Sequence, residues 1–376
     1  MTSTAVGRAA AHTRRGRQPK PSFLPDATRA LVKGLDSGDL ESLGIPSLMV
    51  NAFHLANRPG TGAVRSVGGV HKFMGWNGPV WTDSGGFQLF SLIRENSTNG
   101  RISDDGFAHF SQDNGRTLLT PSKSISNQWR LGADVQFCLD QCTHPDDSRS
   151  AQEESVQRTI QWAKICKAEF VRRCESSRLD HASRPLLFGV VQGGQERDLR
   201  ERCAEALLEI GFDGFGFGGW PISEDGGLVD MVYRVAELIP REFPLHGLGI
   251  GRPDNIISAW RAGYTSFDSA LPTRNARRGR LLIAGDLGAS IQGDPNFFNY
   301  MFITEKQYYR DDRSVDETCP GPCCTRYSRA YLHHLFRIGD ALAQRLATIH
   351  NLTFMQRLMH AAISYMDCGD EDEPQS

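Results

Sequence analysis

The sequence lacks any long hydrophobic run and carries almost no net charge, and both absences limit what the protein can be. No uninterrupted apolar stretch reaches the roughly 18 residues that a membrane-spanning helix needs, and no signal peptide is recognisable. A formal net charge of −2 excludes indiscriminate binding of polyanions. Contacts with nucleic acid must therefore come from local basic clusters. We expect a cytoplasmic protein with no membrane partner.

Acidic residues are missing from the first 20 positions, which carry Arg8, Arg14, Arg15, Arg17 and Lys20. Such a segment could be an organelle transit peptide. Because it has no apolar helical face, its composition favours a disordered basic arm over residues 1–20. At the other end, residues 367–376 are predicted to form a frayed acidic tail. The nine cysteines are scattered and odd in number, which favours a reduced protein over a disulfide framework.

Short apolar runs alternate with longer amphipathic segments, which is typical of a parallel sheet wrapped by helices. Eight such runs favour a (β/α)₈ barrel, the TIM-barrel class of α/β folds, over an open sheet. The predicted strands are Ser22–Leu24, Ser47–Val50, Val80–Thr82, Val135–Leu139, Leu186–Val191, Gly214–Gly218, Leu245–Gly249 and Ser266–Asp268. The predicted helices are Ser148–Glu175, Glu196–Ile210, Gly227–Ile239, Pro253–Gly263 and Leu332–Ile349.

Polar residues stand where these apolar runs end. In a barrel all such ends meet on one rim, which is where these folds place their chemistry. The residues concerned are Asn51, Asp83, Ser84, Asp140, Gln192, Gly219 and Asp268.

Two of the strand-end residues are carboxylates with distinctive surroundings. Asp83 precedes Ser84, Gly85, Gly86 and Phe87, so that backbone and a flat ring can approach a ligand closely. By itself this segment is more typical of an ordinary turn. Asp268 is followed by Arg274, Arg277, Arg278 and Arg280, which suit phosphate contacts but could also be a solvated basic loop. A carboxylate pair on one rim matches glycosidic cleavage with retention, which needs a nucleophile and a group for proton transfer.

Asp140, Gln192 and Gly219 suit the edge of a guanine. A carboxylate accepts hydrogen bonds from N1–H and the exocyclic amine, whereas an amide reaches O6 or N7. The backbone N–H at Gly219 can serve the same carbonyl. Each residue alone is a weak signal, because strand-end Asp and Gln side chains are often caps.

Taken together, these residues resemble the queuine tRNA-ribosyltransferases, also called tRNA-guanine transglycosylases, from about Phe23 to about Met359. The resemblance implies a (β/α)₈ barrel over residues 21–366 that includes a small C-terminal zinc subdomain at about 305–352. It also implies a homodimer and exchange of guanine at wobble position 34 of tRNAs with GUN anticodons. The segments that carry it are Val50–Leu55, Thr82–Gln88, Leu118–Pro121, Gly132–Asp134, Phe267–Arg280 and Tyr327–Leu335.

Residue by residue, the resemblance implies that Asp268 attacks the ribose C1′ and that Asp83 transfers the proton. It makes Asn51 a residue that is hydrogen-bonded near the nucleophile. It assigns the base pocket to Ser84, Gly85, Gly86, Phe87, Asp140, Gln192, Gly219 and Leu248, with Phe87 and Leu248 sandwiching the ring. It assigns RNA contacts to Gly249, Gly251, Arg252, Thr273, Arg274 and Arg277.

The implied mechanism is a double displacement. Asp268 displaces guanine to give a covalent RNA intermediate, and a 7-deazaguanine then attacks the same carbon after losing its proton to Asp83. The configuration at C1′ is retained.

Two segments depart from the family pattern. The family's zinc site is Cys-x-Cys-x-x-Cys followed by a histidine, but Gly321 occupies the middle position here. We predict a structural Zn²⁺, with all four positions filled, bound by Cys319, Cys323, Cys324 and His350. The alternative is a set of buried thiols without a metal.

The second departure is Trp220, which replaces a small or aliphatic residue after Gly219. The bulk of Ile222 and Cys142 favours 7-aminomethyl-7-deazaguanine over queuine as the inserted base. Three other functions stay open: a relative acting on DNA or another base, a non-catalytic RNA-binding partner subunit, and an unrelated barrel glycosidase. Both carboxylates are present, which argues against the partner subunit, and the zinc-like segment argues against the glycosidase.

Overall fold

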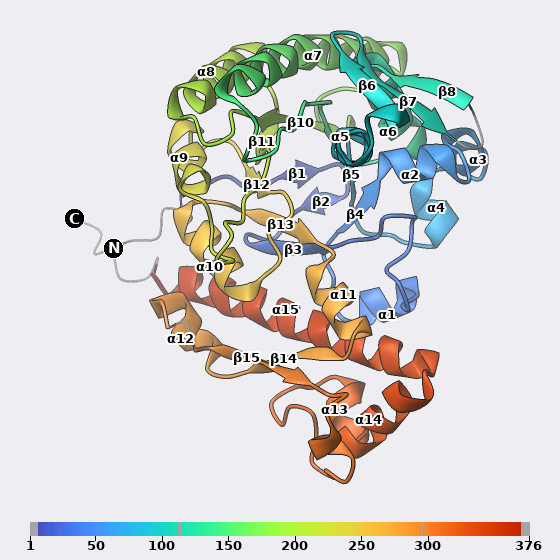
Figure 1. The fold of residues 1–376 in the computed structure, drawn as a ribbon, viewed down its shortest axis with the longest axis vertical. Coiled ribbons are helices and arrows are strands. Elements are labelled where there is room, and N and C mark those ends of the chain that lie inside the picture. Colours follow the sequence, from blue (N-terminus) through green and yellow to red (C-terminus); the bar gives the residue numbers. More distant parts are fainter. Residues whose placement is uncertain (1–6, 112–114, 295, 370–376) are drawn as a thin grey trace.

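A closed barrel of eight parallel strands forms the centre of the molecule (Figure 1). The structure is a computed structural model that describes residues 7–111, 115–294 and 296–369. The strands follow one another around the barrel in chain order, and a parallel bridge between Asp26 and Met49 joins the first to the second. The barrel strands are β3 (Ser22–Pro25), β4 (Leu48–Asn51), β5 (Val80–Asp83), β9 (Val135–Phe137), β10 (Leu186–Val191), β11 (Gly214–Phe217), β12 (Leu245–Gly247) and β13 (Ser266–Ser269).

All eight predicted strands are confirmed as the barrel strands, and the predicted ends differ from the observed ones by no more than two residues. Alternate residues of these strands point into the barrel, as the two-residue period of a strand requires. Large side chains fill the interior, among them Trp81, Phe137 and Phe188, whose rings contact one another edge to face or at a tilt. The barrel is therefore a packed core with its chemistry confined to the rim.

Helices cover the outside of the barrel, and their ends follow from local sequence. Ser148 caps α7 by accepting a hydrogen bond from Ala151 N at 3.3 Å. None of the described helices combines the length and the apolar character needed to cross a membrane. The helices up to the last barrel strand are α1 (Ser37–Ser42), α2 (Ala52–Asn57), α3 (Thr61–Ser66), α4 (Val70–Met74), α5 (Gly86–Glu95), α6 (Pro121–Leu131), α7 (Arg149–Ser176), α8 (Arg197–Ile210), α9 (Asp230–Leu238) and α10 (Pro253–Ala262).

A three-stranded antiparallel sheet is inserted between β5 and β9 and was not predicted. It consists of β6 (Gly100–Ser103), β7 (Gly106–Ser111) and β8 (Gly115–Leu119), preceded by the short 3₁₀ helix η1 (Ser97–Asn99). Its strands contain glycine and several polar residues, so that they lack the continuous apolar run that identified the barrel strands.

The prediction of a disordered arm over residues 1–20 is wrong from Gly7 onward. Strands β1 (His12–Thr13) and β2 (Gly16–Arg17) form a hairpin. The Arg8 side chain is buried and donates hydrogen bonds to the carbonyls of Ala236, Ile239, Pro240 and Phe243. Arg14 binds the buried Asp134 at 2.7 Å. Arg8 and Arg14 are thus paired within the protein, and residues 1–6 of the predicted arm lie outside the described residues.

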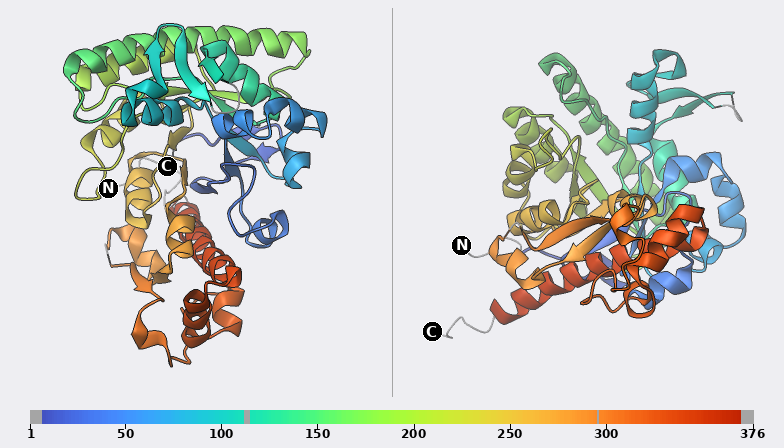
Figure 2. Two further views of the ribbon diagram at one scale, coloured as in Figure 1. Left: turned by 45° about the vertical axis from the view of Figure 1, so that its right-hand side comes forward. Right: turned by 60° about the horizontal axis from the view of Figure 1, so that its bottom comes forward.

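The chain after β13 forms a second unit with its own hydrophobic cluster (Figure 2, orange to red). Helix α15 lies between the barrel strand β3 and the strands of this unit. The cluster already includes Ala276 and Leu281, so the predicted boundary at about residue 305 falls inside the unit. The elements are α11 (Leu271–Arg277), β14 (Arg280–Ala284), α12 (Leu287–Gln292), β15 (Phe298–Phe302), η2 (Lys306–Tyr308), α13 (Pro322–Arg326), α14 (Arg329–Ile338) and α15 (Ala341–Gly369).

The single helix predicted over Leu332–Ile349 is wrong, because Gly339 interrupts it. Gly339 adopts a left-handed conformation with φ of 71° and ends α14, and the Asp340 carboxylate then accepts from Leu342 N at the start of α15. Helix α15 runs on into the predicted acidic tail, and residues 370–376 of that tail lie outside the described residues.

Candidate active site

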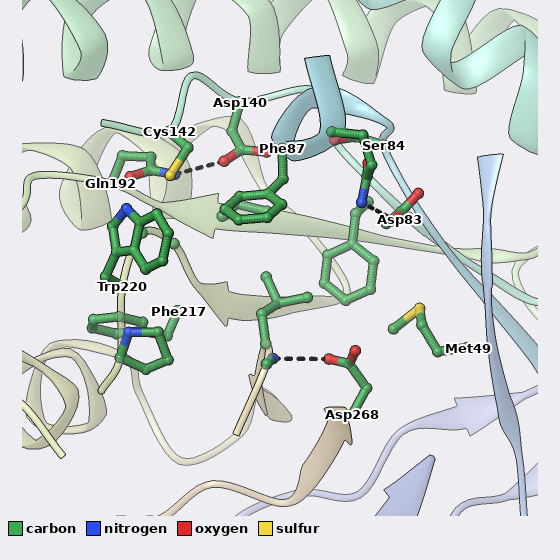
Figure 3. Close-up of a pocket in the computed structure, with 18 of the residues that line it drawn as sticks. Met49, Asp83, Ser84, Phe87, Asp140, Cys142, Gln192, Phe217, Trp220 and Asp268 are labelled. Atoms are coloured by element: carbon green, nitrogen blue, oxygen red, sulfur yellow. Dashed lines mark hydrogen bonds between the residues drawn. The ribbon is translucent and has the colours of Figure 1, made fainter. Parts of the chain in front are cut away.

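The carboxyl ends of the barrel strands enclose a cavity of about 510 Å³ (Figure 3). Asp83 and Asp268 both line it, together with most of the residues predicted for a base pocket. Figure 3 shows Asp140 and Gln192 together on one side of the cavity and the two catalytic candidates on the other. The prediction that the strand ends meet on one rim is therefore confirmed. The predicted residues that line the cavity are Asp83, Ser84, Gly85, Phe87, Asp140, Gln192, Gly219, Leu248, Gly249, Asp268 and Arg274.

Asp83 is the last residue of β5 and is held by three donors. Asn51 Nδ2 lies 2.5 Å from Oδ2, Ala52 N lies 3.0 Å from Oδ1, and Gln88 Nε2 lies 3.2 Å from Oδ2. Strand register explains the first contact, because Asn51 is paired with Asp83 across β4 and β5. Burial raises the pKa of Asp83 to about 7, and the negative charges of Asp268 and Asp26 act in the same direction. A carboxyl group that titrates near neutrality can both accept and return a proton.

Asp268 lies near the end of β13, on the neighbouring side of the cavity. Its Oδ1 accepts hydrogen bonds from Gly249 N at 3.2 Å and from His246 Nε2 at 3.1 Å. The first of these is drawn in Figure 3. Asp83 and Asp268 therefore differ in how they are held: donors contact both carboxylate oxygens of the half-buried Asp83, whereas both donors to the half-buried Asp268 contact Oδ1.

Asp140 and Gln192 face each other across the ends of β9 and β10. Gln192 Nε2 donates to Asp140 Oδ2 at 2.6 Å, and Gln192 Oε1 is buried without a partner among the described residues. Burial raises the pKa of Asp140 to about 6. At pH 7 and above this carboxylate is mostly ionised, so that it presents acceptors to the cavity.

Flat and bulky side chains form the cavity walls. The Phe87 ring contacts Trp220 edge to face at a centroid distance of 5.8 Å, and Trp220 in turn contacts His144. Leu248, Cys142 and Ile222 also line the cavity. Gly85 is required before Phe87, because it has φ of 82° and an added Cβ would lie 3.0 Å from the Cβ of Phe53.

Several predicted site residues do not reach the cavity surface. Asn51 and Gly86 lie behind it, and Asn51 contacts the proton-transfer candidate Asp83. Among the predicted RNA contacts, Gly251 and Thr273 are buried, and the Thr273 hydroxyl donates to Ala270 O. Arg252 is paired with Asp254 at 2.9 Å, while Arg274 is exposed at the cavity and Arg277 is half-buried.

Sequence reasoning missed two basic side chains at this site. His246 contacts Asp268, and its position two residues before Leu248 on the same strand face was the signal that could have identified it. Arg200 is fully buried near the side of the cavity that holds Asp140 and Gln192. It donates to the carbonyls of Gly194 and Gly218 at 3.0 and 2.9 Å. Burial lowers the pKa of Arg200 to about 10. Nothing in its helical sequence context distinguished it from a surface arginine.

A separate group of metal-ligating side chains lies in the C-terminal unit. Ligand atoms of Cys319, Cys324 and His350 all lie within 4.8 Å of one another, and all three residues are buried. His350 Nε2 lies 2.7 Å from Leu282 O, a carbonyl that can only accept, so that Nδ1 is the nitrogen left for a metal. Nδ1 faces Cys324 Sγ at 3.2 Å. This Cys₂His group fits a structural metal ion.

Cys323, which was predicted as the third thiolate ligand, is not in this group. Consecutive residues of the short helix α13 point about 100° apart, and Cys324 is the one whose Sγ faces His350. Gly321 lies beside this group, since a Cβ added there would lie 3.4 Å from Cys319 Sγ. The described residues therefore bring three of the four predicted ligands together.

Comparison with known proteins gives a consistent result. The family model described as "Queuine tRNA-ribosyltransferase" matches residues 4–369. A queuine tRNA-ribosyltransferase of Syntrophobacter fumaroxidans is 39% identical over 94% of this chain and 90% of its own. That of Solidesulfovibrio magneticus is 38% identical over 93% of this chain and 88% of its own. A putative queuine tRNA-ribosyltransferase of Archaeoglobus fulgidus is 36% identical over 92% and 90%, respectively.

Proposed function

This chain belongs to the queuine tRNA-ribosyltransferase family of pentosyltransferases, and from that premise we propose that it replaces guanine at wobble position 34 of tRNA by a 7-deazaguanine. The substrates are the tRNAs with GUN anticodons, for aspartate, asparagine, histidine and tyrosine. The enzyme acts in the cytoplasm, in queuosine biosynthesis, as a homodimer.

The observation that carries this proposal is the pair of carboxylates on one cavity. Asp268 has one oxygen held by two donors and faces the cavity, which suits a nucleophile for the ribose C1′. Asp83 has its pKa raised to about 7 by burial, which suits proton transfer to and from a purine. Asp268 displaces guanine and forms a covalent ribosyl ester, and the incoming base, after losing its proton to Asp83, displaces Asp268 with overall retention.

The base lies between Phe87 and Leu248, with its edge towards Asp140 and Gln192. The Gln192 amide nitrogen donates one N–H to Asp140 in the free site and has a second N–H for O6 or N7 of a purine. The ionised Asp140 then accepts from N1–H and the exocyclic amine. Arg200 holds the backbone of Gly218 beside Gly219, whose N–H serves the same carbonyl.

The size of the cavity supports 7-aminomethyl-7-deazaguanine rather than queuine as the inserted base. Cys142 and Ile222 both occupy its wall, and Trp220 packs on Phe87 beside them. A cyclopentenediol side arm would meet these side chains. Comparing exchange rates for the two free bases tests this preference, and a clearly faster reaction with queuine would contradict it.

We propose Zn²⁺ as the metal of the Cys₂His group, held by Cys319, Cys324 and His350. Thiolate and imidazole ligands are those that zinc prefers in structural sites. When bound, zinc supplies a cross-link between α13 and α15 and takes no part in the exchange reaction.

The decisive experiment is to trap the covalent intermediate. The protein is incubated with a GUN-anticodon tRNA and a slowly reacting base, and the mixture is separated under denaturing conditions. We expect an RNA–protein adduct that disappears in Asp268→Asn. An adduct of the same yield in the variant would contradict the assignment of Asp268. Parallel incubation of labelled guanine with duplex DNA separates RNA from DNA as substrate.

A further inference from the structure

His246 is buried inside the barrel directly below the nucleophile candidate. It belongs to β12, is 0% exposed, and contacts the rings of Trp81 and Phe137 at centroid distances of 5.1 and 5.5 Å. Both ring nitrogens face polar atoms. Nδ1 lies 2.8 Å from Ser266 Oγ, and Nε2 lies 3.1 Å from Asp268 Oδ1. The imidazole therefore bridges two side chains of the adjacent strand β13.

Strand register produces this arrangement. His246 and Ser266 are register partners on the parallel strands β12 and β13. Asp268 follows Ser266 by two residues and so projects from the same face of β13. One imidazole at position 246 can therefore contact both, which a residue at position 245 or 247 would not do.

The direction of the two hydrogen bonds follows from the chemistry of the partners. An ionised Asp268 only accepts, so Nε2 carries the hydrogen and donates to Oδ1. A neutral imidazole then accepts the Ser266 hydroxyl at Nδ1. This chain from Ser266 through His246 to Asp268 fixes both the tautomer and the plane of the ring.

The contact also distinguishes the two oxygens of Asp268. Oδ1 accepts from His246 Nε2 and from Gly249 N, whereas Oδ2 has no donor among the described residues. Hydrogen bonds lower the nucleophilicity of the oxygen that accepts them, and they also hold the carboxylate in one orientation. Oδ2 is thus the free oxygen on a fixed carboxylate.

We propose that His246 is a positioning residue for the nucleophile: it holds Asp268 so that Oδ2 attacks the ribose, and it stabilises the carboxylate when it departs. The inference rests on the proposed role of Asp268. In the first step a lone pair of Oδ2 forms the bond to C1′, and the pair of the C1′–N9 bond leaves with guanine. In the second step a lone pair of N9 of the incoming base forms the new bond to C1′, and the pair of the Oδ2–C1′ bond returns to Asp268. His246 transfers no proton and donates one hydrogen bond throughout.

The test is a single-turnover measurement of RNA adduct formation with His246→Leu and His246→Gln. Leucine removes the donor, while the glutamine amide nitrogen can reach the place of Nε2. We expect His246→Leu to slow adduct formation roughly 10- to 100-fold, the loss of a hydrogen bond to a charged group. His246→Gln should recover most of the rate. The KM for tRNA should stay unchanged in both, since neither variant alters an RNA-facing side chain.

A pair of serine variants provides a matched control. Ser266→Ala removes the hydroxyl that orients the ring and should slow adduct formation roughly 5-fold. Ser22 is the register partner of Ser266 on β3, and its hydroxyl is buried without a partner among the described residues. Ser22→Ala therefore removes the same atoms from the same level of the barrel and should leave the rate unchanged.

Three outcomes overturn the inference: His246→Leu reacting like the wild type, His246→Gln reacting no faster than His246→Leu, or Ser22→Ala slowing the reaction as much as Ser266→Ala. If His246→Leu does not fold, the comparison of His246→Gln with Ser266→Ala and Ser22→Ala decides whether His246 positions Asp268. Failure of the proposed function is distinguishable, because an adduct that persists in Asp268→Asn contradicts the nucleophile itself.

Discussion

The rim of the barrel and the Cys₂His group are each built from a few side chains that are far apart in sequence, but the fold holds them differently. At the rim, register between parallel strands places every strand end on the same level, so that Asn51 meets Asp83 and His246 meets Asp268. The Cys₂His group has no such scaffold. Its ligands come from the loop before α13, from α13 itself and from α15, and the replacement of one residue by Gly321 removes a ligand.

The two regions differ in how much depends on a single side chain. Backbone hydrogen bonds to the neighbouring strands still hold a strand end that loses one side chain, whereas a metal site with three ligands depends on each of them. Substitutions should therefore have local chemical effects at the rim and effects on metal affinity and stability in the C-terminal unit. Four predictions test this comparison.

The largest effect is expected for Asp83→Asn at the rim. Exchange should slow by roughly 10²- to 10⁴-fold, because the group that transfers the proton is lost. The fold should nevertheless become more stable at alkaline pH. Since the pKa of Asp83 is raised from 3.8 to about 7 by burial, the stability that its protonated form provides is fully present below pH 3.8 and is lost as the pH rises through about 7.

An asparagine at position 83 does not ionise, so the variant avoids this loss in the free energy of unfolding, which amounts to at most about 4 kcal/mol. Thermal melts from pH 5 to 9 together with exchange assays measure both effects. Asp26→Asn is the control, because it removes a neighbouring carboxylate, whose pKa burial also raises, without removing a cavity side chain. A stability gain for Asp83→Asn that is independent of pH would contradict the explanation.

In the C-terminal unit, Gly321→Cys should tighten zinc binding. Four-ligand sites bind zinc with about 10–16 kcal/mol, so a fourth thiolate contributes on the order of 3 kcal/mol, or roughly 100-fold in affinity. Competition with a coloured chelator measures the change. Cys323→Ser is the matched control and should leave the affinity unchanged, because Cys323 lies outside the ligand group. Weakening by Cys323→Ser to the level of Cys324→Ser would show that the ligands are assigned wrongly.

A smaller effect is expected for Ile222→Ala, which enlarges the cavity at the rim. The exchange rate with queuine relative to 7-aminomethyl-7-deazaguanine should rise roughly 10-fold, the range that small changes in an apolar pocket produce. Leu228→Ala serves for comparison, since Leu228 is bridged to Ile222 but does not line the cavity. In Leu228→Ala the ratio of the exchange rates with the two bases should stay unchanged. An equal change of this ratio in Leu228→Ala and Ile222→Ala would show that the effect comes from the loop as a whole.

The smallest effect is expected at the rim when the metal is removed. Chelation should lower the melting temperature, because a ligand that binds only the folded state stabilises it. The affinity for the free base should stay within about 2-fold, since none of the three ligands reaches the cavity. Isothermal titration with the base, before and after chelation, measures this. A large loss of base affinity would show that the two regions are coupled.

The barrel could be predicted from the sequence because strands such as Leu186–Val191 are buried on both faces and read as apolar runs that end at polar residues. The cavity residues followed, since strand ends such as Asp83 and Asp140 must meet once a barrel is assumed. The three-stranded insertion was missed because its strands are half-exposed and mixed in composition. The break at Gly339 was missed because the hydrophobic period continues across it.

Other features depend on tertiary contacts that local sequence does not encode. The basic composition of the first residues indicated disorder, but the partners of Arg8 lie more than 200 positions away in the chain. Cys323 and Cys324 are equivalent in sequence, and only the helical turn of α13 decides which one faces His350. His246 reads as one more residue of a short strand until β13 is placed beside it.

The contacts of Arg8 have a consequence for how the protein is made. Its guanidinium has no partner until the chain around residue 243 has left the ribosome, because its acceptors are the carbonyls at the end of α9 and just beyond. At about 5–20 residues per second, that interval lasts on the order of 10 to 50 seconds. During synthesis the segment around Arg8 must therefore wait until almost two thirds of the polypeptide has been made, so that the barrel is completed late in translation.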